Sequence, residues 1–207
     1  KSTLESKTIN ENYKLLALLR ITIANLIQKD FSGTFFNINK VNKLIDEGVV
    51  NTIQDIKNRK YILTFSRFIT LLCPLLEKEN DKHHLEKIPH IGESHCLSFA
   101  HQKLSIASKS QRIQPVLITG AKAWHFADNK NNQWKNSLNQ QVRKHNYSNK
   151  ILISFGEIDC RKDEGILSYS IKNNKDILGI CEKTINDFLK YMELILSPNY
   201  SKRYYFG

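Results

Sequence analysis

The sequence lacks the features that mark secreted and membrane proteins. No run reaches the roughly 18 apolar residues that a membrane span needs. The nearest candidate, Tyr61 to Leu76, is shorter and carries Arg67 in its middle. The chain opens Lys1-Ser2-Thr3-Leu4-Glu5, with neither Met nor an apolar leader, so it does not fit a signal peptide and looks like a chain entered partway through a longer protein. We therefore expect no membrane span and a cytoplasmic location.

Close-paired cysteines are also missing. Cys73, Cys96, Cys160 and Cys181 show none of the spacings that mark a zinc site or a redox pair. Three of the four lie in apolar or strand-adjacent positions, where free buried thiols are common. A reducing compartment is the better expectation.

An excess of basic residues is present, but it is not concentrated. The net charge is +11, with 31 Lys and Arg against 20 acidic residues, and the excess is spread over both halves of the chain. Basic clusters interleaved with aromatics, which a nucleic-acid surface would show, are not evident. We expect no nucleic-acid partner; a basic nucleic-acid-binding domain stays as a remote alternative, below an acidic glycan or anionic surface.

The first third of the chain reads as helical. From about Glu11 to Leu76, apolar residues recur at i, i+3 and i+4. The pattern predicts a first helix, a loop near 31–37, a second helix with Gly48 as its C-cap, and further helices over Val50–Lys57 and Tyr61–Leu72, the last ended by Pro74. We expect a small all-α subdomain at 1–80, followed by a polar linker over 78–86.

From residue 86 to 207 the pattern changes. Short apolar runs at Ile88–Ile91, Pro115–Thr119, Lys150–Phe155 and Arg203–Phe206 predict strands. Between them lie expected helices. Their ranges are 98–108, 132–144 and 177–196. This alternation predicts an α/β domain with a parallel sheet covered by helices on both faces, a three-layer sandwich.

Each of the first three strands ends in a glycine followed by polar residues. The clusters are Gly92-Glu93-Ser94-His95, then Gly120-Ala121-Lys122-Ala123-Trp124-His125, and then Gly156-Glu157-Ile158-Asp159-Cys160-Arg161. In an open parallel sheet, ligands bind beyond the carboxyl ends of the strands. The three clusters are therefore expected to meet at one edge of the sheet.

Ser94 is the best candidate nucleophile in these clusters. A serine just past a glycine turn, at the start of a helix, has an exposed hydroxyl and an N–H that can help hold an oxyanion. The alternative is that Ser94 only caps the following helix, which is a common role for serine. Spacing alone does not separate these two interpretations.

Ile91-Gly92-Glu93-Ser94 resembles the Gly-Asp-Ser block that opens SGNH/GDSL hydrolases, with Glu in place of Asp. Gly120 matches the second block, whose glycine N–H serves the oxyanion hole, and Gly156-Glu157-Ile158-Asp159 falls at the third, Gly-x-Asn-Asp. Trp124-His125, Trp134-Lys135 and the stretch from Phe155 to Arg161 are similar to a bacterial subgroup of the family. The resemblance implies a flavodoxin-like fold and a serine esterase or O-acyltransferase acting on acyl esters, with a surface glycan as one carrier.

Two departures from the family pattern bear on activity. Ile158 stands where the family has an oxyanion-donating Asn, and the Asp-x-x-His block that supplies the base is not in the chain. We expect that block downstream in a longer protein. Within the chain, His125 is the better candidate base and His95 the weaker one, since neighbouring side chains diverge. A catalytically weakened binding or scaffold module is the main alternative.

The remaining polar residues near these turns have open roles. Arg161 is expected to pair with Asp159 or Glu93 and fix the loops, or else to bind an anionic substrate group; Glu157 could orient a catalytic His. Trp124 could stack on a sugar. The other candidate substrate-binding residues are Glu93, His95, Asp159 and Arg161. A metal held by Glu93, His95, His125, Glu157 and Asp159 is geometrically feasible, but the spacing does not require it. We expect neither a metal nor a cofactor.

Overall fold

The computed structural model describes residues 2–78, 85–106 and 108–206. The chain divides into two compact units, Lys1–His83 and His84–Gly207. The division falls within the segment predicted as a linker, of which residues 79–84 lie outside the described part. Each unit is considered by itself.

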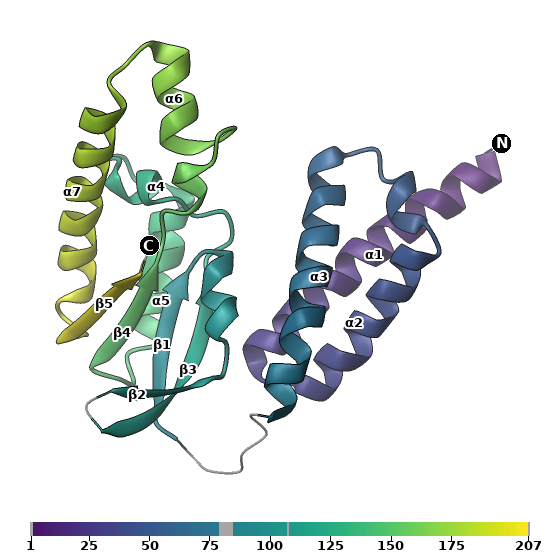
Figure 1. Ribbon diagram of the computed structural model, residues 1–207, viewed down its shortest axis with the longest axis horizontal. Coiled ribbons are helices and arrows are strands. Elements are labelled where there is room, and N and C mark those ends of the chain that lie inside the picture. Colours follow the sequence, from purple (N-terminus) through teal and green to yellow (C-terminus); the bar gives the residue numbers. More distant parts are fainter. Residues whose placement is uncertain (1, 79–84, 107, 207) are drawn as a thin grey trace. The chain divides into compact units, whose positions relative to one another are not determined.

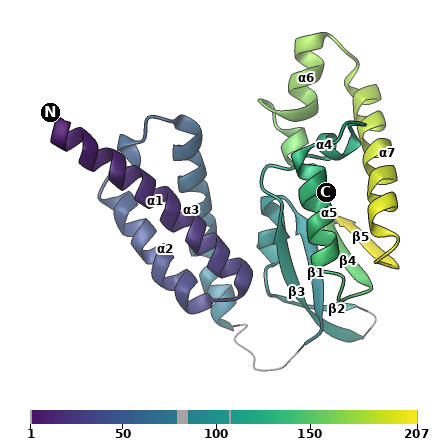
Figure 2. The ribbon, with the colours of Figure 1, turned by 180° about the vertical axis from the view of Figure 1, so that it is seen from behind.

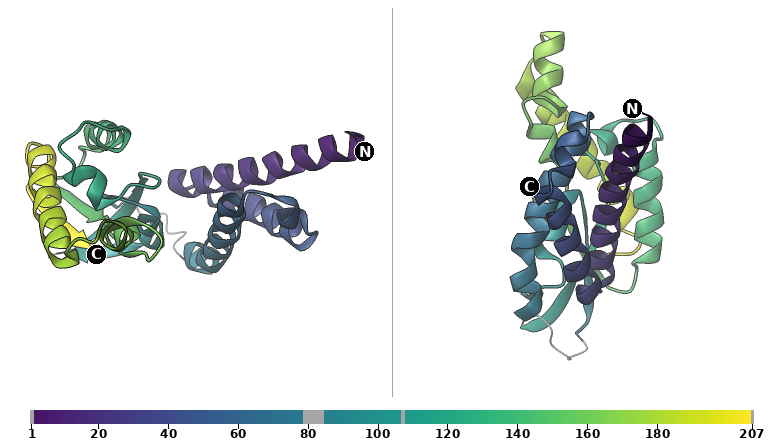
Figure 3. Two further views of the ribbon diagram at one scale, coloured as in Figure 1. Left: turned by 90° about the horizontal axis from the view of Figure 1, so that it is seen from above. Right: turned by 90° about the vertical axis from the view of Figure 1, so that its right-hand side faces the viewer.

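The first unit is helical. Its elements are α1 Ser2–Gln28, α2 Phe31–Asp46, the 3₁₀ helix η1 Val49–Thr52 and α3 Ile56–Lys78. The three α-helices lie against one another (Figures 1 and 3). They bury aliphatic side chains that share helical spacing in the sequence, including Leu15, Leu19 and Val41. No described helix is both long enough and apolar enough to cross a membrane.

Several expected boundaries in this unit are corrected. Residues 31–37 are helical, because Asp30 caps α2 by accepting the N–H of Gly33 at 2.9 Å. Val50–Lys57 is a 3₁₀ turn followed by the start of α3, and Pro74 lies inside α3. Proline removes one N–H donor there, yet the helix runs on for four residues. Gly48 does follow the end of α2, in the left-handed conformation at φ +80°.

The second unit is a mixed α/β unit around one five-stranded sheet. Its strands are β1 Lys87–Gly92, β2 Lys103–Ile106, β3 Lys109–Leu117, β4 Lys150–Ser154 and β5 Lys202–Phe206. Its helices are η2 Ser94–Phe99, α4 Ala123–Ala127, α5 Gln133–Lys144, η3 Ile158–Cys160, α6 Gly165–Asn173 and α7 Ile177–Leu196. The strand order is β2-β3-β1-β4-β5, and only the β2–β3 pair is antiparallel. The predicted α/β class is confirmed. The sheet is mostly parallel, and its antiparallel β2–β3 pair was not predicted.

One face of this sheet carries the main core. Successive strand residues point to opposite faces, so Ile91, Ile151 and Ile153 form one buried row. Helices α4, α5 and α7 pack their apolar side chains on that row. Helix α5 lies in front of the strands when the molecule is seen from behind (Figure 2). A smaller cluster on the opposite face contains Ile88, Ile113 and Leu152.

The expected helix over 98–108 is wrong. The 3₁₀ helix η2 ends at Phe99, and the chain then forms the β2–β3 hairpin. Ser108 has φ +63°, a left-handed turn conformation that a continuous helix does not contain. In contrast, α5 and α7 lie where helices were expected between the predicted strands. Helix α6 was not expected.

Candidate functional site at the carboxyl ends of three strands

The turns after β1, β3 and β4 begin side by side. Gly92 is in register with Leu117 of β3 and with Ser154 of β4. The N–H of Ile118 donates to the carbonyl of Gly92 at 2.8 Å, and the N–H of Glu93 donates to the carbonyl of Ser154 at 3.2 Å. The structure therefore places the three predicted strand ends at one edge of the sheet.

The strand order identifies the most suitable place for a ligand at this edge. The parallel strands run β3-β1-β4-β5. The chain passes from β1 outward to β3 and then returns across β1 to β4, so its direction of progress reverses between β1 and β4. Open α/β sheets bind ligands in the crevice formed at such a reversal. The turns after β1 and β4 carry Glu93, Ser94, His95 and Glu157.

Gly92 sits where no side chain fits. A Cβ atom at this position would lie 2.2 Å from the hydroxyl oxygen of Ser154 and 2.5 Å from its carbonyl oxygen. Glycine is needed here for the close approach of β1 and β4, not for an unusual φ. Gly120 and Gly156 differ: they have φ of +67° and +124°, and a Cβ would meet nothing within 4 Å.

Ser94 is the first residue of η2 and is partly exposed. Among the described residues, no hydrogen-bond partner is found for its hydroxyl, for its N–H or for the N–H of Gly120. The side chain of Glu93 makes no capping hydrogen bond to η2. The first turn thus presents donor groups at the sheet edge. Ile158 is buried, and its side chain offers no donor there.

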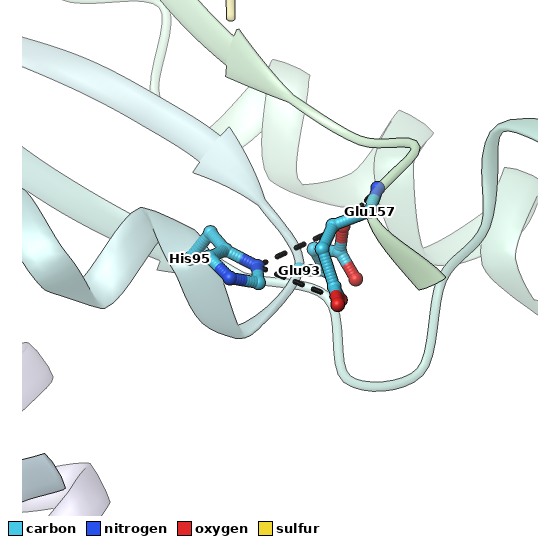
Figure 4. Close-up of side chains that lie close together, drawn as sticks. All are labelled: Glu93, His95 and Glu157. Atoms are coloured by element: carbon cyan, nitrogen blue, oxygen red, sulfur yellow. Dashed lines mark hydrogen bonds and ion pairs between the residues drawn. The ribbon is translucent and has the colours of Figure 1, made fainter. Parts of the chain in front are cut away.

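Glu93, His95 and Glu157 form a cluster (Figure 4). The Nδ1 atom of His95 lies 4.0 Å from Oε1 of Glu93 and 3.9 Å from Oε2 of Glu157. The Glu93 side chain is only 1% exposed, whereas His95 and Glu157 are about half exposed. Of the five residues considered for a metal in the sequence, the structure brings these three together.

The two carboxyl groups of this cluster differ in their electrostatics. Burial raises the pKa of Glu93 to about 7, and the nearby charge of Glu157 acts in the same direction. Hydrogen bonds from Arg161 lower the pKa of Glu157 instead. Arg161 donates through Nε and Nη2 to Glu157 at 2.7–3.1 Å. The expected pairing of Arg161 with Asp159 or Glu93 is therefore corrected: its hydrogen-bonded partner is Glu157, one helical turn away in sequence.

Asp159 has a structural role in this arrangement. It is 3% exposed, and its carboxylate accepts the N–H groups of Ala123 at 2.7 Å and Trp124 at 3.3 Å. These are the first two residues of α4, so Asp159 joins the turn after β4 to the turn after β3. Gly165 allows this packing, because a Cβ there would lie 2.4 Å from the Asp159 backbone.

His125 is fixed within the turn after β3. Its Nδ1 accepts the N–H of Lys122 at 3.0 Å, and its ring stacks on Trp134 with centroids 3.5 Å apart. Burial lowers its pKa to about 4. A neutral imidazole has one nitrogen lone pair, and here that lone pair is already used. This geometry argues against His125 as the base for Ser94.

Trp124 borders a cavity of about 360 Å³ between α4, α6 and α7. It is 36% exposed, and its ring centroid lies 5.1 Å from that of Tyr169. Polar residues Asp128, Asn129 and Thr184 also line the cavity. An exposed aromatic ring beside hydrogen-bonding groups is compatible with the predicted sugar contact.

Comparisons with protein-family models, with curated proteins and with solved structures found no match to this chain.

Proposed function

We propose that the α/β unit is a serine esterase or O-acyltransferase of the SGNH type, with a three-layer fold and Ser94 as the nucleophile. The observation that carries the proposal is the meeting of three glycine-led turns at the reversal of strand order, with Ser94 starting the turn after β1. Numbered one to four along the chain, the parallel strands β1, β3, β4 and β5 lie in the order 2-1-3-4. This is the order of the first four strands of flavodoxin-like sheets, which the sequence resemblance implies.

In the proposed reaction, the Ser94 hydroxyl oxygen attacks the carbonyl carbon of an acyl ester. The N–H groups of Ser94 and Gly120, which have no partner among the described residues, stabilise the developing oxyanion. The alcohol leaves with a proton, and the acyl group passes from Ser94 to water or to another hydroxyl. A carbohydrate is a suitable alcohol portion because the cavity beside Trp124 joins aromatic and polar groups.

The base is the open part of this mechanism. His125 has its lone pair engaged, so we leave the role to the Asp-x-x-His block that the resemblance implies. A binding or scaffold module on the same fold is the second candidate. Buried Ile158, which replaces an oxyanion donor, is the observation that favours it.

The test compares Ser94→Ala and Ser98→Ala with the unsubstituted parent, using a chromogenic acyl ester and an active-site phosphonate probe. Ser98 lies in the same 3₁₀ helix and serves as the matched control. We expect loss of turnover and labelling in Ser94→Ala only. Turnover that survives Ser94→Ala would exclude Ser94 as the nucleophile, and a folded parent without turnover or labelling would favour the binding module.

A further inference from the structure

We propose that Glu93, His95 and Glu157 bind a divalent first-row transition-metal ion of the Zn²⁺ class. The three side chains come from the two turns between which the strand order reverses. Each offers one ligand atom, and these atoms lie within 4.8 Å of one another. Figure 4 shows the His95 ring directed toward both carboxyl groups. The proposal concerns metal binding and does not require Ser94 to be a nucleophile.

A buried oxygen of Glu93 gives an independent indication of a ligand. Oε1 of Glu93 accepts the N–H of Glu157 at 3.0 Å. Oε2 is buried, and no donor in the described part of the chain meets hydrogen-bond geometry with it. The backbone N–H of Ile158 is nevertheless near enough to the carboxyl group to lower the pKa of Glu93. Most buried polar atoms in proteins are partnered, and a buried carboxylate oxygen without a partner is costly. The Glu93 oxygen that lies 4.0 Å from His95 is Oε1, so a cation would give Oε2 a partner when both oxygens of the carboxylate bind it.

Arg161 supports the cluster without occupying it. Oε2 of Glu157, which lies 3.9 Å from His95, accepts hydrogen bonds from both Nε and Nη2 of Arg161. Oε1 accepts only one, from Nε, and so keeps a lone pair for a metal ion. Carboxylates that bind metals are commonly held by such an outer hydrogen bond. Arg161 fixes the direction of the Glu157 carboxylate, just as the Glu157 N–H fixes that of Glu93.

The donor set and spacing suit a Zn²⁺-class ion. One imidazole nitrogen and two carboxylate oxygens match borderline ions better than Ca²⁺ or Mg²⁺, which prefer all-oxygen shells. Zn²⁺ bonds of about 2.0–2.2 Å require ligand atoms roughly 3.4 Å apart. The observed 3.9 and 4.0 Å need to shorten by about half an ångström, and the two carboxylate oxygens, which lie within 4.8 Å of each other, by up to about 1.4 Å. Arg161 holds the Glu157 carboxylate, so the half-exposed His95 ring, whose Nδ1 is common to both distances, has to make most of this movement.

Such an ion would keep open coordination positions at the sheet edge. Three protein ligands leave at least one position for water or a substrate oxygen, as in catalytic Zn²⁺ sites. The ion would lie next to Ser94, which Glu93 and His95 flank in the sequence. It would draw a carbonyl or anionic oxygen to the edge where the N–H groups of Ser94 and Gly120 lie.

Calorimetric titration of the chelator-treated chain with ZnCl₂ tests the proposal. His83→Gln and His84→Gln are introduced throughout, because these two adjacent histidines lie outside the described residues and could bind Zn²⁺ themselves. We expect one equivalent of Zn²⁺ to bind, and Co²⁺ to give a visible absorption band that Zn²⁺ displaces. Mg²⁺ should not compete.

Variants then assign the ligands. His95→Asn and Glu157→Gln should each weaken binding by more than ~10-fold, the smallest effect usual for even an outer-shell partner. Arg161→Gln should weaken it by ~10-fold. Glu164→Gln, an exposed carboxyl paired with Lys122, is the matched control and should bind as before. Thermal unfolding checks that each variant folds.

Two outcomes overturn the proposal: no Zn²⁺ binding by the folded chain, or binding that His95→Asn leaves unchanged. Ser94→Ala separates this proposal from the proposed function. It should bind Zn²⁺ normally even where it abolishes turnover, so either idea can fail without the other.

Discussion

The polar residues around the sheet edge fall into two groups that differ in how fully they are partnered. Asp159 and His125 have their acceptors filled by backbone N–H groups. Ser94 and Glu93 present groups for which the described chain offers no partner. The first group, with Gly92, forms a framework; the second, with His95 and Glu157, forms the cluster that faces a ligand. Buried His90 belongs to the framework through its bond to Ser154, although its Nδ1 has no partner among the described residues. Framework changes should cost stability, whereas changes in the cluster should cost binding or activity.

The largest effect is expected for Gly92→Ala. The new Cβ would have to displace the backbone of Ser154, so the free energy of unfolding should fall by about 3 kcal/mol or more. Urea denaturation measures this loss. Gly179→Ala in the first turn of α7, where the added Cβ meets only the Asp176 side chain, is the control and should lie within about 1 kcal/mol of the parent.

The next largest effect is a pH dependence from His90. This side chain is 1% exposed and bonds to the Ser154 hydroxyl at 2.9 Å, and burial lowers its pKa from 6.5 to about 4. Between these values the unfolded chain takes up the proton and the folded chain does not. The contribution of neutral His90 to the free energy of unfolding is therefore fully present above pH 6.5. It is lost as the pH falls toward 4, by up to about 3 kcal/mol.

Comparing the parent with His90→Gln isolates this contribution, because His125 and His145, whose pKa values are also lowered, remain in both proteins. The variant should lose less stability between pH 6.5 and 4. Equal slopes in the two proteins would show that His90 is not buried in its neutral form.

A loss of about 2 kcal/mol is expected for Asp159→Ala, which leaves two N–H groups at the start of α4 without an acceptor. Asp159→Asn keeps one acceptor oxygen and should lose less. Asp163→Ala, an exposed acid in the same turn, is the control for charge and should change the melting temperature little.

The smallest stability effect is expected for Arg161→Gln. Its ion pair with Glu157 joins two side chains that are each 44% exposed, and such pairs contribute about 0–1 kcal/mol. Thermal unfolding should hardly change. A loss of stability as large as that of Asp159→Ala would show that Arg161 stabilises the fold, as the framework residues do.

Most strands of the α/β unit could be predicted because their signals are local. Short apolar runs before a glycine predicted β1 and β4 closely. The hairpin after η2 was missed, because its turn depends on left-handed backbone at Ser108. No local pattern requires serine to adopt that conformation.

The candidate site could be predicted only in part. Glycine-led turns located the edge and its polar residues, but the choice among them depends on strand order and on long-range hydrogen bonds. Asp159 and Glu157 are two residues apart in the sequence, yet one turns inward to α4 and the other outward to Arg161. The spacing of the two residues in the sequence does not predict that their side chains point in different directions.

The contact of Asp159 with the start of α4 also has a consequence for motion. The turn after β3 cannot open at Ala123 and Trp124 unless the turn after β4 releases them. These two amides should therefore exchange their hydrogens at one shared rate, set by a single opening event. A ligand bound to either turn would then slow the opening of both turns. The Asp159 carboxylate would couple them without contacting the ligand.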